Sequence, residues 1–212
     1  VIYMPNLPQF VIIYYGILKA GGIVIATNPL YTERELQHQL KDCGAETVFV
    51  LSRYYPLLKK VQKSGETQVK RIIVTYIKHY LPSVKGVLYG LLKEKKEGDR
   101  VDIEPGDVTL KDFIALGSRS PKANVAVSGD DIALLQYTGG TTGLSKGAVL
   151  THRNIVAATL QAEAWFTPAL SKVGDLSKAN SIAALPLYHI FALTLCLLAI
   201  RQGSSLTLIP NP

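Results

Sequence analysis

The sequence predicts an α/β fold with layered, mainly parallel sheets covered by helices on both faces. Short apolar runs, often rich in β-branched residues, alternate along the chain with segments of helical periodicity. These runs are continuously apolar, as expected for parallel strands that are buried on both faces. With 48% apolar residues in a chain of 212, there is ample material for a buried core.

The first third of the chain holds the clearest alternation of strands and helices. The pair Pro5–Asn6 starts the first helix, and Gly21–Gly22 ends it. Thr32 and Glu35 form a capping-box pattern at the start of the second helix, which Gly44 stops. We expect strands at residues 1–4, 23–26, 47–51 and 71–75, and helices at 5–19, 33–43 and 54–63.

The alternation is interrupted in the middle of the chain. Residues 77–122 contain a basic apolar stretch, Ile77–Lys96, followed by a helix near 110–116 and a polar linker. We therefore divide the chain into a first α/β portion at 1–76, a basic insertion and linker at 77–122, and a second α/β portion at 123–212.

In the second α/β portion, the alternation of strands and helices resumes. Thr151 is a good N-cap for its long helix, and Gly203 closes its last helix. The apolar run Ile190–Ile200 is too short to span a bilayer and predicts a buried helix. We expect strands at 132–137, 148–150, 181–185 and 205–209, and helices at 151–166 and 189–201.

The positive charge is concentrated in one segment. The net charge is +7, but residues 53–100 alone hold 12 Lys/Arg against 4 Asp/Glu, a net of +8. This distribution does not indicate nucleic-acid binding by the whole chain. Within Ile77–Lys96, leucines and valines recur at helical spacing among lysines, although Pro82, Gly86 and Gly90 weaken a helix. Two interpretations stay open: an interfacial helix drawn to an anionic membrane surface, or a solvated insertion packed on the sheet by its leucines.

The cysteines and the chain ends bear on where the protein works. Cys43 and Cys196 lie far apart, and Cys196 lies inside an apolar run. We interpret both as reduced structural thiols, which fits a cytoplasmic protein. The chain begins within one apolar strand and ends just after another, so we expect it to be part of a longer protein.

A glycine-rich segment, Tyr137–Gly147, is the strongest functional signal. Its eleven residues hold four glycines, three threonines and one lysine, directly after the apolar run 132–136. Glycines let backbone N–H groups approach an anion, while hydroxyls and an ammonium group add donors to phosphate. The segment is not a Walker A loop, because Ser145 precedes Lys146 and Gly147 follows it, and its glycines do not have the dinucleotide-fold spacing. We favour a phosphate-binding loop over the alternative, a hairpin turn rich in small residues.

Three segments together make the chain resemble the adenylate-forming superfamily, and more narrowly its bacterial long-chain fatty-acyl-CoA synthetases. They are the glycine-rich segment followed by Leu150–Asn154, the segment Leu185–Leu193, and the segment Ala26–Thr32. Gly140, where most of the superfamily has Ser, is a form of the fatty-acyl branch, while Ser145 replaces the usual Pro. The resemblance covers nearly the whole chain and implies part of the family's large N-terminal domain.

The resemblance implies a two-step reaction. A fatty acid carboxylate attacks the α-phosphorus of ATP to give acyl-AMP and pyrophosphate, and CoA then displaces AMP to form the thioester. Thr142 and Lys146 are the residues expected to act in catalysis, because donors aimed at the departing pyrophosphate stabilise its charge. The residues expected to bind ATP are Thr138, Gly139, Gly140, Thr141, Thr142, Gly143 and Lys146.

The resemblance also assigns a metal ligand and a substrate contact. Thr138 is expected to help hold Mg²⁺, which would partly neutralise the triphosphate. His189 corresponds to a family position that lines the cleft where adenylate and acyl group meet, although a lone histidine before a helix is often purely structural. Leu193 stands where some members carry the aromatic residue that gates the acyl tunnel, so gating by an aromatic side chain is not expected here.

Later segments of the family are not found in this chain. These are the Tyr-Gly-x-Thr-Glu segment, the aspartate that binds the ribose, and the C-terminal domain with its lysine. We therefore expect a fragment that binds ATP weakly and has no catalysis of its own. Alternatives are a non-catalytic nucleotide- or acyl-binding module, an unrelated phosphotransferase, or another adenylate-forming ligase such as an aryl-CoA ligase or a peptide-synthetase adenylation domain. The expected partners are fatty acid, ATP and CoA, with no nucleic acid.

Overall fold

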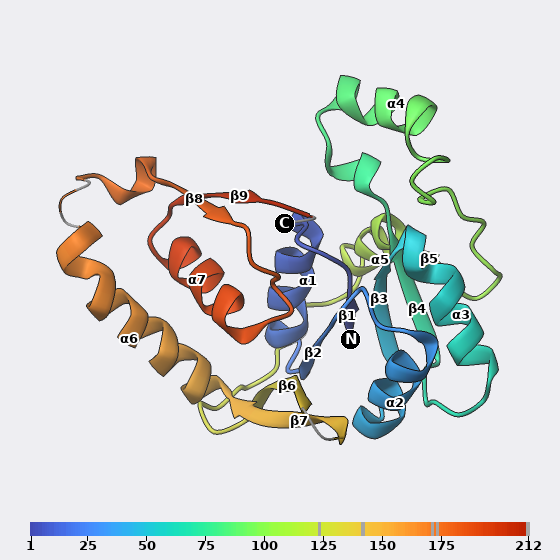
Figure 1. The fold of residues 1–212 in the computed structure, drawn as a ribbon, viewed down its shortest axis with the longest axis horizontal. Helices are drawn as coiled ribbons and strands as arrows, with labels where there is room; N and C mark the ends of the chain where they lie inside the picture. Colours follow the sequence, from blue (N-terminus) through green and yellow to red (C-terminus); the bar gives the residue numbers. More distant parts are fainter. Residues whose placement is uncertain (123, 141–142, 171, 173, 211–212) are drawn as a thin grey trace.

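A computed structural model describes residues 1–122, 124–140, 143–170, 172 and 174–210. Within this part of the chain, seven strands form one sheet in the order β5-β4-β3-β1-β2-β6-β7, and two more form a separate sheet (Figure 1). All neighbouring strands run parallel except β6 and β7, which form an antiparallel pair. The strands are β1 (Ile2–Tyr3), β2 (Val24–Thr27), β3 (Thr47–Leu51), β4 (Arg71–Thr75), β5 (Val108–Thr109), β6 (Ile132–Gly140), β7 (Gly143–Thr151), β8 (Asn180–Ala183) and β9 (Ser205–Leu208).

Helices cover both faces of the large sheet, as the sequence predicts (Figure 1). Successive residues of a strand point to opposite faces, so Ile2 belongs to one core cluster and Tyr3 to the other. The Ile2 cluster includes residues of α1, α5 and α7, and the Tyr3 cluster includes residues of α2 and α3. The helices are α1 (Pro8–Lys19), α2 (Glu33–Cys43), α3 (Tyr55–Lys63), α4 (Ser83–Leu92), α5 (Leu110–Gly117), α6 (His152–Leu170) and α7 (Ile190–Arg201), with short 3₁₀ turns at Ser52–Tyr54, Ile77–Tyr80 and Leu176–Lys178.

The predicted helix ends are confirmed where side chains cap them. Thr32 and Glu35 make both bonds of the capping box of α2: the Thr32 N–H donates to Glu35 Oε2 (2.8 Å), and the Glu35 N–H donates to Thr32 Oγ1 (3.4 Å). Gly44 ends α2 with φ 61°, a left-handed conformation that favours glycine. At the start of α6, the Asn154 N–H donates to Thr151 Oγ1 (3.3 Å), so Thr151 is the N-cap.

The described residues of the glycine-rich segment form the facing ends of two strands of a hairpin, β6 and β7. The sequence analysis ends one strand at 137 and begins the next at 148, but β6 continues to Gly140 and β7 begins at Gly143. The two strands pair through this region, with Thr138 opposite Lys146 and Gly140 opposite Gly143. Pairing with a neighbour overrides the weak strand propensity of glycine, which is why composition alone underestimated both strands.

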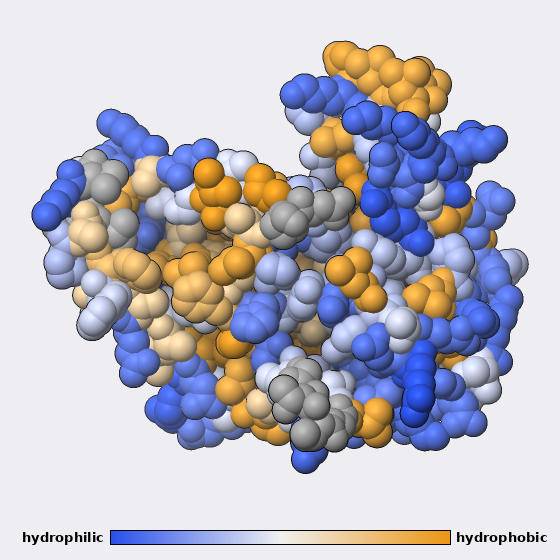
Figure 2. All heavy atoms as spheres, in the orientation of Figure 1, coloured by the Kyte–Doolittle hydropathy of each residue, from blue (hydrophilic) through white to orange (hydrophobic). Residues whose placement is uncertain are grey.

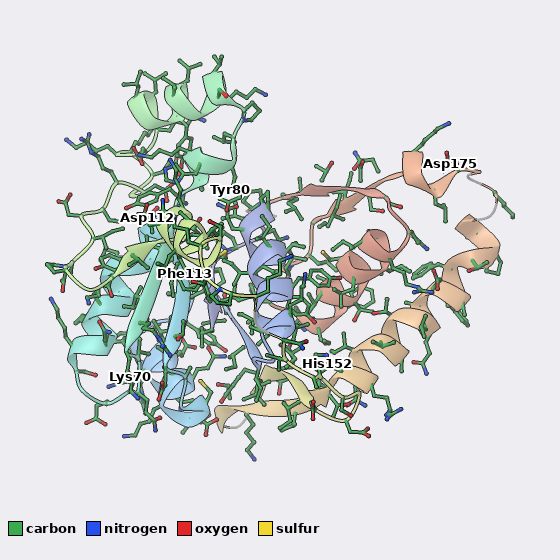
Figure 3. All side chains as sticks on the ribbon, turned by 180° about the vertical axis from the view of Figure 1, so that it is seen from behind. Lys70, Tyr80, Asp112, Phe113, His152 and Asp175 are labelled. Atoms are coloured by element: carbon green, nitrogen blue, oxygen red, sulfur yellow. The ribbon has the colours of Figure 1, made fainter. Side chains whose placement is uncertain are left out.

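Two elements of the predicted insertion are attached to the large sheet, one as an edge strand and one as a helix packed on it. β5 pairs with β4 at the edge of the sheet, and α5 contacts β4. Figure 3 labels Phe113 on α5. Its ring packs edge-to-face on Phe49 of β3, with ring centroids 5.7 Å apart. The division at 76 and 122 stays a prediction.

α4 stands apart from the rest of the molecule (Figure 1). Its leucines do not pack on the sheet, so that interpretation of Ile77–Lys96 is wrong: Leu88, Leu91 and Leu92 are 50%, 77% and 72% exposed. Close packing on the preceding 3₁₀ turn holds the helix instead, since a Cβ on Gly86 would lie 2.7 Å from the Lys78 carbonyl oxygen. None of the helices in the described residues is long and apolar enough to cross a bilayer. The predicted burial of 190–200 is confirmed in α7, where Leu193, Cys196 and Leu197 lie in the core.

Candidate functional site

The hairpin of β6 and β7 brings two of the predicted phosphate ligands together. Thr138 and Lys146 are cross-strand partners, so their side chains lie next to each other on one face of the hairpin, and both are exposed. Gly139, Gly140 and Gly143 lie at the strand ends beside the tip. The predicted residues Thr141 and Thr142 lie outside the described residues. The arrangement presents a hydroxyl and an ammonium group side by side.

The same face of β6 contacts the second motif segment. Gln136 lies two residues before Thr138, so both side chains point to one side of the strand. Gln136 is 6% exposed, and its Nε2 donates to the Tyr188 carbonyl oxygen (3.1 Å) and to the Tyr137 carbonyl oxygen (3.2 Å). The segment that carries His189 therefore lies beside the strand that carries Thr138, although the two segments are about fifty residues apart in sequence.

His189 occupies the N-cap position of α7 with its side chain exposed. Its φ and ψ of −97° and 132° are extended, and the imidazole makes no capping hydrogen bond to the helix. The backbone of His189 is fixed, since its N–H donates to the Pro186 carbonyl oxygen (2.9 Å) and its carbonyl oxygen accepts from the Leu193 N–H (3.0 Å). A fixed backbone with an exposed ring suits a contact to a ligand.

Asn6 holds the second motif segment from the other side. Its side chain is 2% exposed, and Nδ2 donates to the carbonyl oxygens of Ala183 (3.1 Å) and Leu185 (2.8 Å). Its Oδ1 accepts from the Leu187 N–H (2.7 Å). One buried amide thus makes three hydrogen bonds to backbone groups at the end of β8 and in the irregular segment that follows it.

The opposite face of the hairpin rests on α2. Tyr137 Oη donates to Asp42 Oδ2 (2.5 Å), and the ring is 8% exposed. Burial, together with the hydrogen bond to Asp42, raises the pKa of Tyr137 well above its usual range. His38 Nε2 lies 3.1 Å from the Ser145 carbonyl oxygen. Burial also raises the pKa of Tyr31, while a hydrogen bond with the Ser145 side chain opposes that shift.

Sequence reasoning missed the residues that support the site. Asn6 was interpreted only as a helix start, and Asp42, His38 and Gln136 were not singled out. The signal available for Gln136 is that it is the polar residue in the apolar run 132–136. The partners of Asn6 and Asp42 are remote in sequence, so local patterns carry no signal for them. In the described residues, no group of three or more His, Cys, Asp or Glu side chains could hold a metal ion.

The hydrogen bond from Gln136 thus joins two of the motif segments beside a mostly parallel sheet. The sequence profile of a family described as "AMP-binding enzyme" matches residues 1–212. The chain belongs to this family of AMP-binding enzymes, which confirms the resemblance stated from the three segments.

Several relatives similar to this chain carry one name. It is 43% identical over 211 residues to a long-chain-fatty-acid–CoA ligase of Yersinia pestis, covering 99% of this chain and 36% of that protein. It is 35% identical over 213 residues to the protein of the same name in Bacillus subtilis, covering 98% of this chain and 36% of the relative. The chain thus spans little more than a third of the length of these relatives.

Solved structures share the fold. A long-chain-fatty-acid-CoA ligase (FadD1) from Archaeoglobus fulgidus matches 97% of this chain and 34% of its own, with 27% identity and a TM-score of 0.71. The anthranilate CoA ligase AuaEII in complex with anthranoyl-AMP matches 100% of this chain and 35% of its own, with 22% identity and a TM-score of 0.73. These matches confirm the predicted α/β class.

Proposed function

We propose that this chain is part of an AMP-forming long-chain fatty acid–CoA ligase. The observation that carries the proposal is the Gln136–Tyr188 hydrogen bond, because it joins the face of Thr138 and Lys146 to the segment of His189. The hairpin that we propose to bind phosphate and the residue that we propose to line the acyl side then lie in neighbouring segments, as an adenylation site requires. The names of the relatives support the fatty-acyl substrate. The three-part division at 76 and 122 and a cytoplasmic location are parts of the same proposal.

In the first step, a carboxylate oxygen of the fatty acid forms a bond to the α-phosphorus of ATP. The bond from that phosphorus to the bridging oxygen breaks, and pyrophosphate leaves with the negative charge. The hydroxyl of Thr138 and the ammonium group of Lys146 stabilise this charge from one face of the hairpin, aided by Thr141, Thr142 and the glycine N–H groups. In the second step, the CoA thiolate attacks the acyl carbon, and AMP leaves. His189 lines the acyl side of the site.

The described residues fit Mg²⁺ only in part. The exposed Thr138 hydroxyl is a hard oxygen donor of the kind that Mg²⁺ takes, and it lies beside Lys146, where phosphate would bind. Because these residues hold no carboxylate cluster for a metal, most of the coordination would come from phosphate oxygens and water. Mg²⁺ bound there would neutralise part of the triphosphate charge.

The test is pyrophosphate release by the complete protein, screened with fatty acids of graded length and with aromatic acids. Lys146→Ala and Thr142→Ala should each lower the turnover by about 10²-fold, the usual cost of one aimed donor. Lys122→Ala, in the exposed linker, is the matched control and should leave turnover unchanged. Release of ADP in place of AMP would refute adenylation, and a preference for aromatic acids would indicate an aryl-CoA ligase. Nucleotide binding without pyrophosphate release would favour the alternative, a non-catalytic binding module.

We also propose that α4 binds the surface of an anionic membrane. Five apolar side chains of this helix are between 50% and 77% exposed, and four exposed lysines flank them. Figure 2 shows these apolar residues as a cap at the top of α4, with polar surface beneath it. An apolar face bordered by lysines matches the interface of a bilayer that carries negative lipid. The apolar residues are Val84, Val87, Leu88, Leu91 and Leu92, and the lysines are Lys85, Lys93, Lys95 and Lys96.

One buried carboxylate joins the two ends of the segment 77–96, and a second, just beyond it, ties the segment to Arg53 in the body. Glu94 pairs with Lys78 (2.6 Å), and Asp99, 1% exposed, accepts from Arg53 Nε and Nη2 (2.9 and 2.8 Å) and from the Tyr89 hydroxyl. Polar contacts on the inner side leave the apolar side of α4 free for lipid.

Liposome sedimentation tests the membrane proposal. Each lysine near an anionic surface contributes about 1 kcal/mol, so reversing Lys93, Lys95 and Lys96 to Glu should weaken binding by at least about 10²-fold. Leu91→Ser should weaken binding by loss of apolar contact. Leu116→Ser on α5 is the matched control, because Leu116 is 67% exposed and Leu91 77%. If the wild-type protein does not bind anionic liposomes at low salt, the membrane proposal for α4 is refuted.

A further inference from the structure

We infer that helix α2 positions the phosphate-binding hairpin, with His38 and Asp42 as positioning residues that hold its two strands. This inference rests on the proposed function of the hairpin. It concerns side chains on the face opposite to Thr138 and Lys146, and none of them touches the proposed phosphate site.

One face of α2 contacts both strands of the hairpin. Residues four apart in a helix lie one above the other, so His38 and Asp42 present neighbouring side chains. Asp42 Oδ2 accepts from the Tyr137 hydroxyl of β6 (2.5 Å), and His38 Nε2 donates to the Ser145 carbonyl oxygen of β7 (3.1 Å). The second bond requires the ring proton to be on Nε2, because a carbonyl oxygen only accepts.

Each contact lies one residue before a proposed phosphate ligand. Tyr137 precedes Thr138 on β6, and Ser145 precedes Lys146 on β7. Neighbouring residues of a strand point to opposite faces, so the Tyr137 side chain that contacts α2 lies behind the face that presents Thr138, while the His38 contact holds the backbone of β7 next to Lys146. Because Thr138 and Lys146 are cross-strand partners, the two contacts fix both members of one pair.

The packing of Tyr137 makes its position specific. A Cβ placed on Gly147, its cross-strand partner, would lie 3.0 Å from Tyr137 Cε2 and 3.1 Å from Cζ. These distances are tighter than ordinary contact, so the ring lies against the bare backbone of Gly147. The ring is held between this glycine and Asp42, which limits how far β6 can move along β7.

The two side chains that α2 contributes to these contacts lie at or near the surface. Asp42 is exposed and His38 is half-buried, while the core of α2 is formed by Leu36 and Leu40. A hydrogen bond at such a position contributes about 1–2 kcal/mol, a small part of the free energy of unfolding of a folded domain. Its more direct effect is on the geometry of the hairpin, where a small misplacement of aimed donors costs rate.

The experiment combines pyrophosphate release by the complete protein with amide hydrogen exchange of residues 143–151 in the absence of nucleotide. Tyr137→Phe and Asp42→Ala each remove the same hydrogen bond. We expect each to lower kcat about tenfold and to speed exchange of the hairpin amides, with little change in the unfolding midpoint. Their double variant should be no worse than either one, because the two residues share one bond.

Conservative variants and a control separate positioning from general damage. Asp42→Asn keeps an acceptor oxygen and should restore most of the rate, while His38→Gln keeps a donor and should be milder than His38→Leu. Lys41→Ala is the matched control, because this neighbour of Asp42 pairs with Glu66 (2.7 Å), away from the hairpin. It should change neither rate nor exchange.

The outcomes distinguish this inference from the proposed function. Faster exchange with unchanged kcat would overturn the positioning role, and unchanged exchange would overturn the hold of α2 on the hairpin. If the wild-type protein releases no pyrophosphate, the ligase proposal fails, and exchange alone decides whether α2 holds the hairpin.

Discussion

Replacing Asn6 with alanine should destabilise the protein far more than its position near the start of the sequence suggests. The Asn6 side chain is 2% exposed and makes three hydrogen bonds to the backbone at Ala183, Leu185 and Leu187. At about 1 kcal/mol for each bond, alanine loses about 3 kcal/mol. Leu187 is fully buried, so its unpaired N–H adds a cost of about 1 kcal/mol. We expect a loss of about 3–4 kcal/mol in the free energy of unfolding.

Urea unfolding of the complete protein measures this loss, with Asn28→Ala as the matched control. The Asn28 side chain also accepts a backbone hydrogen bond, from the Leu30 N–H (2.9 Å), but in an exposed turn, so its loss should cost about 1 kcal/mol or less. Hydrogen exchange should rise at residues 183–189, and pyrophosphate release should fall with it. A loss for Asn6→Ala no larger than that of the control would refute the reasoning.

The remaining predictions concern an anchor, a cap and a thiol. Asp99→Ala should lower the free energy of unfolding by about 2–3 kcal/mol and speed exchange across residues 77–99, because Arg53 loses a buried partner; a loss as small as that of Asp102→Ala would contradict this. Thr32→Ala should cost about 1 kcal/mol at pH 7. Hydrogen bonds from Thr32 lower the pKa of Glu35, so the stability that the cap contributes is present above the ordinary glutamate pKa and should shrink as the pH falls through the lowered pKa of Glu35. Urea unfolding of both proteins from pH 7 to 3 measures this change. A difference in stability that stays constant over this range would contradict the mechanism. Burial raises the pKa of Cys196 to about 11, so a thiol reagent at pH 8 should modify it only as fast as the protein opens, and rapid labelling would contradict its burial.

Local signals predicted the parts of the fold that local chemistry determines. The strands at 47–51 and 71–75 have the predicted bounds, because each is a continuous apolar run between clear breakers. Thr32 and Gly44 delimit α2 as expected, since a cap requires only residues within one turn of the helix end. The ends of β6 and β7 were missed because they depend on pairing between two strands, which no local pattern predicts. A glycine at 140 or 143 extends only because its partner strand is present.

The residues of the candidate site also fall into those that local patterns predict and those that they do not. Composition identified Thr138 and Lys146 as donors, and the hairpin register places them opposite each other. The supports of the site are contacts between remote segments: Asn6 and Leu187 are 181 residues apart, and Asp42 and Tyr137 are 95 apart. No short-range pattern distinguishes such an Asn or Asp from one that faces solvent. Resemblance of motifs therefore names the ligands but not the residues that hold them.

The arrangement of these supports explains how two motif segments that are remote in sequence can form one site. The hairpin is held by α2, and the segment before α7 is held by Asn6, which lies just before α1. Both helices pack on the large sheet, so each motif is fixed to the same rigid body rather than to the other motif. The Gln136–Tyr188 bond then needs only to align two parts that are already in place. A site built in this way leaves the front of the hairpin free to receive a charged ligand, because the polar contacts that fix it are made at its back and along its base.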